Sequence, residues 1–273
     1  MSATEKDCRG TAFSAEQHTD LNAAGRLRFE HRLGPVRRVD RISFLIERAR
    51  GKRVLHLGCA AAYLDLAKDP HLHAQLAAVA NELWGLDLSA RAISQLREAG
   101  FANLICGDAE RLGDIDDLRD QHFDVIIAGE LIEHLSNPGL FLNGCKALCS
   151  ADTELILTTP NALLYSQTLF ALLDRESVHP DHTLFWSPTT LRTLVTRSGL
   201  AIKEFLVYGG TPCVLLTHKE SVRRQFARLA LRCLDGAIRQ TVVRFRPWLN
   251  NGLIVVAQRE FESPLRELVG GSR

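Results

Sequence analysis

The sequence has little net charge and no paired cysteine motif, and these absences exclude several classes of protein. In its 273 residues, 33 Lys and Arg nearly balance 32 Asp and Glu, so a globally basic nucleic-acid binder is not expected. The seven cysteines are odd in number and contain no CxxC pair, which argues against a disulfide framework and a zinc ribbon. We therefore expect reduced, mostly buried cysteines.

Targeting and membrane signals are also missing. The N-terminus has no basic start followed by an apolar run, so we expect no secretory signal and a cytoplasmic protein. The longest uncharged stretch, from Ile156 to Leu173, has the length of a membrane span but includes Thr158, Pro160 and Asn161. It is therefore interpreted as a strand, a loop and the start of a helix.

Short apolar runs alternate with helical patterns along most of the chain. The runs predict strands at 53–60, 82–89, 103–108, 123–130, 154–161, 201–208 and 252–259. Apolar residues at helical spacing predict helices at 36–50, 72–81, 90–99, 135–149 and 187–200. This order predicts an α/β fold, a doubly wound and mostly parallel seven-stranded sheet with helices on both faces.

The predicted domain organisation is simple. Residues 1–34 form a polar leader that could belong to a substrate lid, and 35–273 form one domain with a basic helical insertion at about 218–248. Between Lys219 and Arg246, eight Lys and Arg stand against Glu220 and Asp235. Such a stripe could track RNA phosphates, lie on an acidic membrane surface, or be an ordinary solvated helix face.

Ligands of parallel sheets bind at the carboxyl ends of the strands, which directs attention to the residues that follow each predicted strand. Gly58 would let the backbone approach a ligand closely, Asp87 can accept hydrogen bonds from a ribose diol, and Asp108 can accept one from an adenine amine. The loop after Gly58 reads GCAAAYL and lacks the GxGxxG fingerprint. We therefore expect a nucleoside ligand without a diphosphate, which disfavours a nicotinamide oxidoreductase.

The series VLHLGCA, LWGLDLS, NLICGDAE, FDVIIAGELIEHLSNP and ILTTPN resembles the ordered motifs of class I S-adenosylmethionine-dependent methyltransferases, over about residues 54–161. The resemblance implies a Rossmann-like methyltransferase fold and S-adenosylmethionine as cofactor. ELIEHL and the later HPDH segment are similar to a bacterial subgroup that methylates small molecules, which implies O-methylation of a sugar-, polyketide- or lipid-linked acceptor. The alternative from another functional class is a protein that binds the cofactor but catalyses no methyl transfer.

Positions that match the family motifs are the expected cofactor contacts. The resemblance implies that Gly58 and its neighbours line the methionine part, that Asp87 holds the ribose hydroxyls, that Asp108 and Ala109 flank the adenine, and that Glu130 lies at the floor of the site. The full set is Leu57, Gly58, Cys59, Asp87, Leu88, Asp108, Ala109 and Glu130. The chain departs from the family pattern at His56, where an acid is usual, and at Ala60 and Ala62, where glycines are usual.

Two histidine-containing segments are candidates for the chemistry of the acceptor. If a helix begins near Glu130, one turn presents Glu130, Glu133 and His134 to the same cleft, as a proton acceptor or a cation site, or merely as acids favoured at a helix start. In HPDHTLFW, Asp181 and His182 could contact substrate, or satisfy backbone groups of a helix-entry loop. We expect His134 or His182 to be the general base, with Asp181 as a further candidate.

The same two segments also resemble metal-dependent enzymes that methylate the terminal 2′-hydroxyl of small RNAs. That resemblance implies Glu130, Glu133, His134 and His182 as metal ligands and an RNA ribose 2′-O-methyltransferase as the alternative function. Because ELIEHL is common among small-molecule methyltransferases, we assign no metal ligand from the sequence and expect a small-molecule acceptor.

Overall fold

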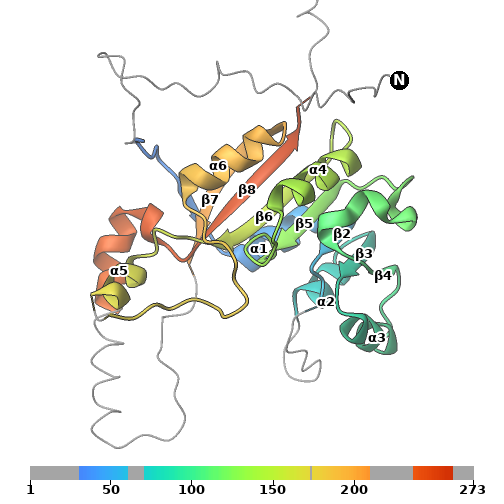
Figure 1. The fold of residues 1–273 in the computed structure, drawn as a ribbon, viewed down its shortest axis with the longest axis horizontal. Coiled ribbons are helices and arrows are strands. Elements are labelled where there is room, and N and C mark those ends of the chain that lie inside the picture. Colours follow the sequence, from blue (N-terminus) through green and yellow to red (C-terminus); the bar gives the residue numbers. More distant parts are fainter. Residues whose placement is uncertain (1–30, 61–70, 173, 210–235, 261–273) are drawn as a thin grey trace, which may run out of the picture. The chain divides into compact units, whose positions relative to one another are not determined.

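The computed structural model describes residues 31–60, 71–172, 174–209 and 236–260 (Figure 1). The chain forms two units, Met1–Gly34 and Pro35–Arg273, and all the elements below belong to the second. The strands are β1 (Arg37–Val39), β2 (Arg53–Leu57), β3 (Glu82–Asp87), β4 (Leu104–Cys106), β5 (Val125–Gly129), β6 (Glu154–Pro160), β7 (Leu200–Tyr208) and β8 (Gly252–Arg259). The α-helices are α1 (Arg41–Ala49), α2 (Leu72–Ala77), α3 (Ala90–Glu98), α4 (Pro138–Leu148), α5 (Tyr165–Ala171) and α6 (Pro188–Arg197).

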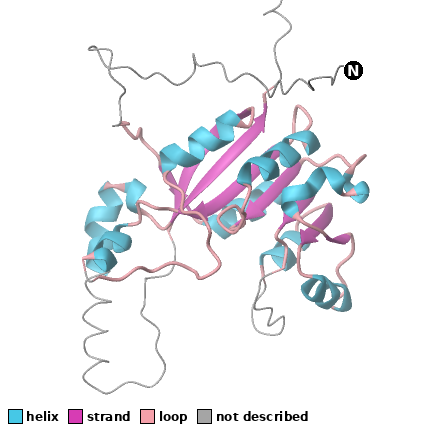
Figure 2. Ribbon diagram, viewed as in Figure 1, coloured by secondary structure: helices cyan, strands magenta, loops and turns pink. Residues whose placement is uncertain are grey.

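The strands form one eight-stranded sheet in the order β1-β7-β8-β6-β5-β2-β3-β4. Figure 2 shows the strands of this sheet in magenta among the helices in cyan. All neighbouring pairs are parallel except those of β8, which runs antiparallel to both β6 and β7. The predicted doubly wound, mostly parallel sheet is thus confirmed, with one strand more than the seven expected. The added strand, β1, pairs with the outer side of β7.

The start of the first helix differs from the prediction. A helix was expected from Val36, but β1 occupies Arg37–Val39 and α1 begins at Arg41. Asp40 accounts for the boundary, because its carboxylate accepts a hydrogen bond from the Ser43 backbone N–H at 2.8 Å and caps the helix. The apolar residues between positions 36 and 39 therefore belong to a strand and not to the first turn of the helix.

The helix before β7 begins as the sequence predicts. Ser187 accepts a hydrogen bond from the backbone N–H of Thr190, Pro188 stands in the first turn, and Gly199 takes the left-handed conformation after the helix, at φ 73°. The acidic linker after β4, by contrast, folds into two 3₁₀ helices, Ala109–Asp114 and Asp116–Leu118.

Two apolar clusters fill the space above and below the sheet. One gathers residues from β2, β5, β6, α4 and α6, including Leu57, Phe141 and Leu191, which are all fully buried. The other packs α1 and α2 against the opposite face through residues such as Leu45, Leu76 and Ile127. Because both faces are covered, the strands are buried and their carboxyl ends are the places where polar groups can reach a ligand.

The described segments contain no helix that is both long and apolar enough to cross a lipid bilayer. Most of the predicted basic insertion, including Lys219, Arg223, Arg228 and Arg232, lies outside the described residues. The part that is described, between residues 236 and 251, contains a π-helix at Arg239–Val243 and a 3₁₀ turn at Pro247–Leu249.

Candidate functional site

The turn after β2 has the geometry expected of a ligand-binding glycine. Gly58 adopts φ +68°, in the left-handed region that disfavours other residues, and a Cβ there would lie 3.1 Å from Leu131 Cδ1. Its backbone N–H and that of Cys59 both donate to the Leu86 carbonyl of β3, at 2.8 and 3.1 Å. The following residues of this loop, 61–70, including Ala62, lie outside the described residues.

Asp87 ends β3 beside this turn. Its two carboxylate oxygens accept hydrogen bonds from the Ala60 N–H at 3.0 Å and the Ser89 N–H at 2.9 Å. An ionised carboxylate has about four acceptor positions, so two remain for the hydroxyls of a bound ribose. The predicted diol contact is therefore chemically possible in this arrangement, and Gly58 and Asp87 fit a nucleoside cofactor.

The other predicted cofactor contacts surround these two residues. Asp108 begins a 3₁₀ helix, accepting from the Glu110 N–H at 2.9 Å, and Ala109 behind it is buried. Leu88 is 73% exposed, whereas Leu57 is fully buried at the end of β2. Burial raises the pKa of the Cys59 thiol to about 12, so this side chain is an apolar packing group and no nucleophile.

Three histidines lie beneath the turn. His56 and His73 are 2% and 1% exposed, their Nδ1 atoms are 3.2 Å apart, and the rings are stacked, with His71 beside His73. Burial is the main cause that lowers the pKa of His73 to about 4 and the pKa of His56 well below 6.5, so both rings are neutral at pH 7. The departure from the usual acid at position 56 is thus accommodated by a second imidazole.

The segment directly after β5 does not contain the helix start that was considered near Glu130, although the helix predicted at 135–149 is present as α4. Glu130 takes a left-handed conformation at φ +53°, residues 131–134 form a turn, and α4 begins only at Pro138. The prediction that one helical turn presents Glu130, Glu133 and His134 together is therefore wrong. The Glu133 carboxylate points inward instead, fully buried, and accepts a hydrogen bond from the Thr159 hydroxyl at 2.9 Å. Burial, with the nearby charge of Glu130, raises the pKa of Glu133 to about 8.

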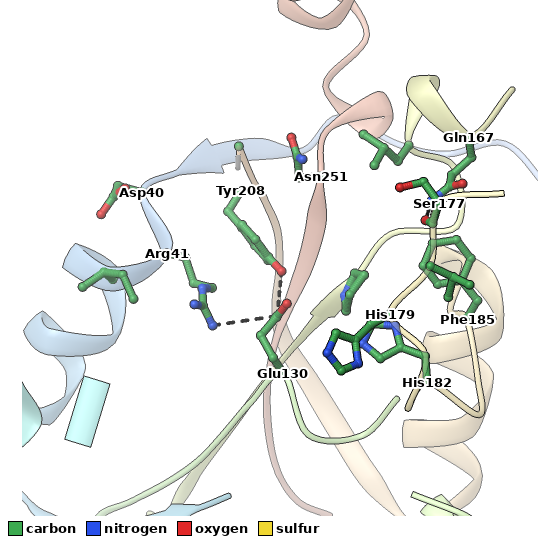
Figure 3. A pocket seen from close by; sticks show the side chains of 15 residues that line it. Asp40, Arg41, Glu130, Gln167, Ser177, His179, His182, Phe185, Tyr208 and Asn251 are labelled. Atoms are coloured by element: carbon green, nitrogen blue, oxygen red, sulfur yellow. Dashed lines mark hydrogen bonds and ion pairs between the residues drawn. The ribbon is translucent and has the colours of Figure 1, made fainter. Parts of the chain in front are cut away.

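Glu130 belongs to a cavity of about 770 Å³ at the carboxyl ends of β5 and β6 (Figure 3). Its carboxylate accepts hydrogen bonds from the Tyr208 hydroxyl at 2.6 Å and from the Thr158 hydroxyl at 2.9 Å, and lies 3.8 Å from the Arg41 guanidinium. Figure 3 shows Arg41 and Tyr208 on one side of this carboxylate and His179 and His182 on the other. The lining also includes Ile42, Leu164, Gln167, Ser177, Val178, Phe185, Gly209 and Asn251.

The position of Tyr208 depends on a glycine opposite it. Tyr208 ends β7 and pairs with Gly252 at the start of β8, and a Cβ on Gly252 would overlap the tyrosine ring. Burial and the adjacent Glu130 raise the pKa of Tyr208 well above its usual value, so the phenol stays protonated and remains a hydrogen-bond donor. The Arg41 guanidinium lies 5.6 Å from the centre of the same ring.

The two predicted general bases come together across the same region. The rings of His134 and His182 are 4.6 Å apart and almost perpendicular, and His179 joins them at 5.3 Å from His182. The His134 Nδ1 lies 3.2 Å from the Asp181 backbone carbonyl. The Asp181 carboxylate is 72% exposed and 3.8 Å from His179 Nδ1. Burial and the two neighbouring imidazoles lower the pKa of His182.

Sequence reasoning missed three residues of the cavity. Arg41 and Tyr208 stand far from every motif, at the start of α1 and the end of β7, and reach Glu130 only through the folded sheet. His179 was quoted within the HPDH segment, but no role was given to it. A weak signal existed for Tyr208, because it is the last residue of a predicted strand and strand ends carry ligand contacts.

Comparisons with known proteins agree with this geometry. A family model described as a methyltransferase domain matches residues 28–204. The ubiquinone biosynthesis O-methyltransferase of Haemophilus ducreyi is 25% identical over 217 residues, covering 73% of this chain and 86% of that protein. The enzyme of the same name from Coxiella burnetii is 28% identical over 199 residues, covering 67% of this chain and 77% of that protein.

Solved structures share the fold at low sequence identity. A chain in the complex between the Haloferax volcanii Trm112 methyltransferase activator and a methyltransferase superposes with a TM-score of 0.50 at 14% identity, over 81% of this chain and 89% of that chain. A SAM-dependent methyltransferase from Archaeoglobus fulgidus superposes with a TM-score of 0.49 at 20% identity, over 80% of this chain and 91% of that chain.

Proposed function

This chain belongs to the methyltransferase-domain family, as a class I S-adenosylmethionine-dependent enzyme, and from that premise we propose that it methylates a hydroxyl of a small molecule held in the cavity beside Glu130. The observation that carries the proposal is the position of this cavity. It lies at the same edge of the sheet as Gly58 and Asp87, at the carboxyl ends of the parallel strands, where enzymes of this topology bind their ligands.

The cofactor residues that we propose are those whose local geometry suits a nucleoside. Gly58 permits close approach of a ligand to the backbone, Asp87 retains acceptor positions for the ribose hydroxyls, and Asp108 stands at the end of the next strand. Bound S-adenosylmethionine supplies a methyl group that its sulfonium already activates. The protein then has to align the acceptor and take up the proton of the hydroxyl.

The cavity suits an acceptor with both polar and apolar parts. Its volume of about 770 Å³ lies within the range of small-molecule sites, roughly 300–1,000 Å³. Leu164, Val178 and Phe185 offer apolar surface, whereas Arg41 and Glu130 offer charges. The O-methyltransferase relatives support an oxygen acceptor.

We assign activation of the hydroxyl to the cluster of His134, His179 and His182. Two of these rings, those of His179 and His182, line the cavity, and a neutral imidazole can accept a proton near pH 7. His134 packs behind His182, with its Nδ1 beside the Asp181 carbonyl. Asp181 would then position the cluster through its backbone, because its carboxylate is mostly in solvent.

The test is a methyl-transfer assay that follows release of S-adenosylhomocysteine with a panel of small hydroxylated acceptors and with a short RNA. We expect turnover with a small molecule. Tyr208→Phe removes the donor to Glu130 and should lower kcat/KM by about tenfold while the Kd of the cofactor is unchanged, because one hydrogen bond to a charged group is lost.

Tyr165→Phe is the matched control, since Tyr165 is another tyrosine and is not among the residues that line the cavity. Equal activity of Tyr208→Phe and wild type would remove this cavity from the proposal. Turnover with RNA alone would favour ribose methylation instead, and cofactor binding without any transfer would favour a non-catalytic homologue.

A further inference from the structure

Three histidines from two distant segments meet at the cavity. His134 comes from the turn after β5, and His179 and His182 come from the segment between α5 and α6. One ring nitrogen of each lies within 4.8 Å of the others. Within the part of the chain that the structure describes, this is the sole group of three or more His, Cys, Asp or Glu side chains that comes so close together.

We propose that His134, His179 and His182 bind a divalent transition-metal ion. Imidazole nitrogen is a preferred ligand of zinc, cobalt and nickel ions. Zinc–nitrogen bonds of about 2.0–2.1 Å at tetrahedral angles place ligand nitrogens about 3.3 Å apart. The nitrogens of the three rings lie within 4.8 Å of one another, so the rings would have to close by up to about 1.5 Å to reach this spacing.

The hydrogen bond of His134 leaves a nitrogen of its ring available. Its Nδ1 lies 3.2 Å from the Asp181 carbonyl oxygen, which can only accept, so Nδ1 carries the proton. In the neutral ring, Nε2 then keeps its lone pair. Metal-binding histidines characteristically donate their other N–H to a carbonyl or a carboxylate in this way, which fixes the orientation of the ring.

The other two rings support the same assignment. His182 Nδ1 is buried and has no hydrogen-bond partner among the described residues, and a buried polar atom without a partner costs stability that an ion would restore. His179 Nδ1 accepts a hydrogen bond from the Asp181 backbone N–H at 3.3 Å, and the Asp181 carboxylate lies 3.8 Å away. An ion on Nε2 would therefore require the other tautomer of this ring, in which Nδ1 gives up the backbone N–H and donates to the carboxylate.

This ligand set differs from the one that the RNA-methyltransferase resemblance implies. Glu133 is buried against Thr159, and the Glu130 carboxylate is bonded to Tyr208 and Thr158. Neither joins the histidines in a group of candidate ligands among the described residues. Three protein ligands leave a fourth tetrahedral position open, as in catalytic zinc sites. That this position receives the acceptor hydroxyl rests on the proposed function, whereas binding of the ion does not. With an ion bound, the rings would use their lone pairs as ligands, so the cluster would activate the hydroxyl through the ion, which lowers the pKa of a bound hydroxyl, and not by accepting the proton on an imidazole.

The experiment titrates the full-length protein, without cofactor or acceptor, with Co²⁺ while recording the visible absorption of tetrahedral cobalt, and with Zn²⁺ by calorimetry. We expect one ion per chain. His179→Gln and His182→Gln should each weaken binding by about 100-fold, because each removes one of three ligands. His122→Gln is the matched control, since His122 is an exposed histidine before β5.

Failure of wild type to bind either ion at millimolar concentration, or equal binding by wild type and His182→Gln, would overturn the inference. Circular dichroism of each variant shows whether it is folded, and His179→Gln changes an exposed ring that is not part of the core. If the protein transfers methyl groups but binds no ion, the metal site is overturned and the proposed function stands. If it binds the ion but transfers no methyl group, the metal site stands and the proposed function is overturned.

Discussion

Three histidines lie at each of two places along one sheet, and the two groups differ in burial. Beneath the cofactor turn, His56 and His73 are sealed between strands and helices, with His71 beside them. At the acceptor cavity, His134, His179 and His182 are partly exposed and meet at an open surface. In the first group His56 and His73 are buried, whereas in the second group the rings of His179 and His182 line a cavity that a small molecule can enter.

The comparison teaches that the role of a histidine follows from its surroundings. Burial holds the rings under the turn neutral, where they serve as packing groups. The difference extends to the residues around them. The proposed cofactor region is formed by Gly58 and Asp87, whose contacts are with nearby backbone groups, whereas the proposed acceptor region joins Arg41, Glu130 and Tyr208 from three distant elements.

The largest effect on binding is expected in the proposed cofactor region. Asp87→Ala should weaken the binding of S-adenosylmethionine by about 100-fold or more in calorimetry, because two hydrogen bonds to a charged carboxylate are lost. Asp114→Ala is the control, since Asp114 is an exposed acid paired on the surface with Arg111. If the Asp87 variant binds the cofactor as wild type does, Gly58 and Asp87 do not form the cofactor region.

The buried histidines should make stability depend on pH. The pKa of His73 is about 4 in the folded protein and about 6.5 when unfolded, so the unfolded chain binds more protons in that window. Stability from this ring is complete above pH 6.5 and falls as the pH drops. His73 alone should cost about 2 kcal/mol of the free energy of unfolding between pH 7 and pH 5.

Urea unfolding at pH 5, 6 and 7 measures this effect as the difference between wild type and His73→Gln. The difference is needed because Glu133, with its pKa raised to about 8, acts with the opposite sign: its contribution to stability falls as the pH rises from about 4.5 to 8. His122→Gln should keep the wild-type dependence. Parallel pH profiles for wild type and His73→Gln would show that the two histidine groups do not differ as described.

The smallest effect is expected from the turn itself. Gly58→Ala places a Cβ at φ +68° and 3.1 Å from Leu131 Cδ1, and should lower the free energy of unfolding by about 1 kcal/mol. Gly113→Ala is a control, because nothing lies within 4 Å of a Cβ at that position. Leu131 belongs to the turn that carries Glu130 and His134. A simultaneous loss of acceptor affinity would therefore show that a change at Gly58 is transmitted through Leu131 to the acceptor region.

Local signals predicted most of the fold. The apolar runs gave β2 through β8 within a few residues, because buried parallel strands are continuous apolar segments, and Ser187 correctly marked the start of α6. The family and the cofactor also followed from ordered motifs and are confirmed by the comparisons. Strand β1 was missed because the apolar residues between positions 36 and 39 continue the helical spacing of α1 in the sequence, and the segment forms a strand only by pairing with β7.

The acceptor site could not be predicted to the same extent. Glu130, Glu133 and His134 fit a helical spacing, yet the left-handed backbone at Glu130 turns Glu133 into the core and His134 toward the HPDH segment. Positive φ at a glutamate has no sequence signature. The partners of Glu130 come from positions 41 and 208, and only the order of the strands brings them together.

The segment from 209 to 251 begins and ends at the rim of the cavity, because Gly209 and Asn251 both line it. Directly below these residues, Tyr208 and Gly252 are already paired in the antiparallel register of β7 and β8. The described end of the segment is also held from the side, because the Asn161 side chain after β6 donates hydrogen bonds to the backbone carbonyls of Trp248 and Asn250. One wall of the cavity is therefore fixed at both ends by backbone pairing, so a change of side chain at Gly209 or Asn251 would alter the cavity without altering the register of β7 and β8.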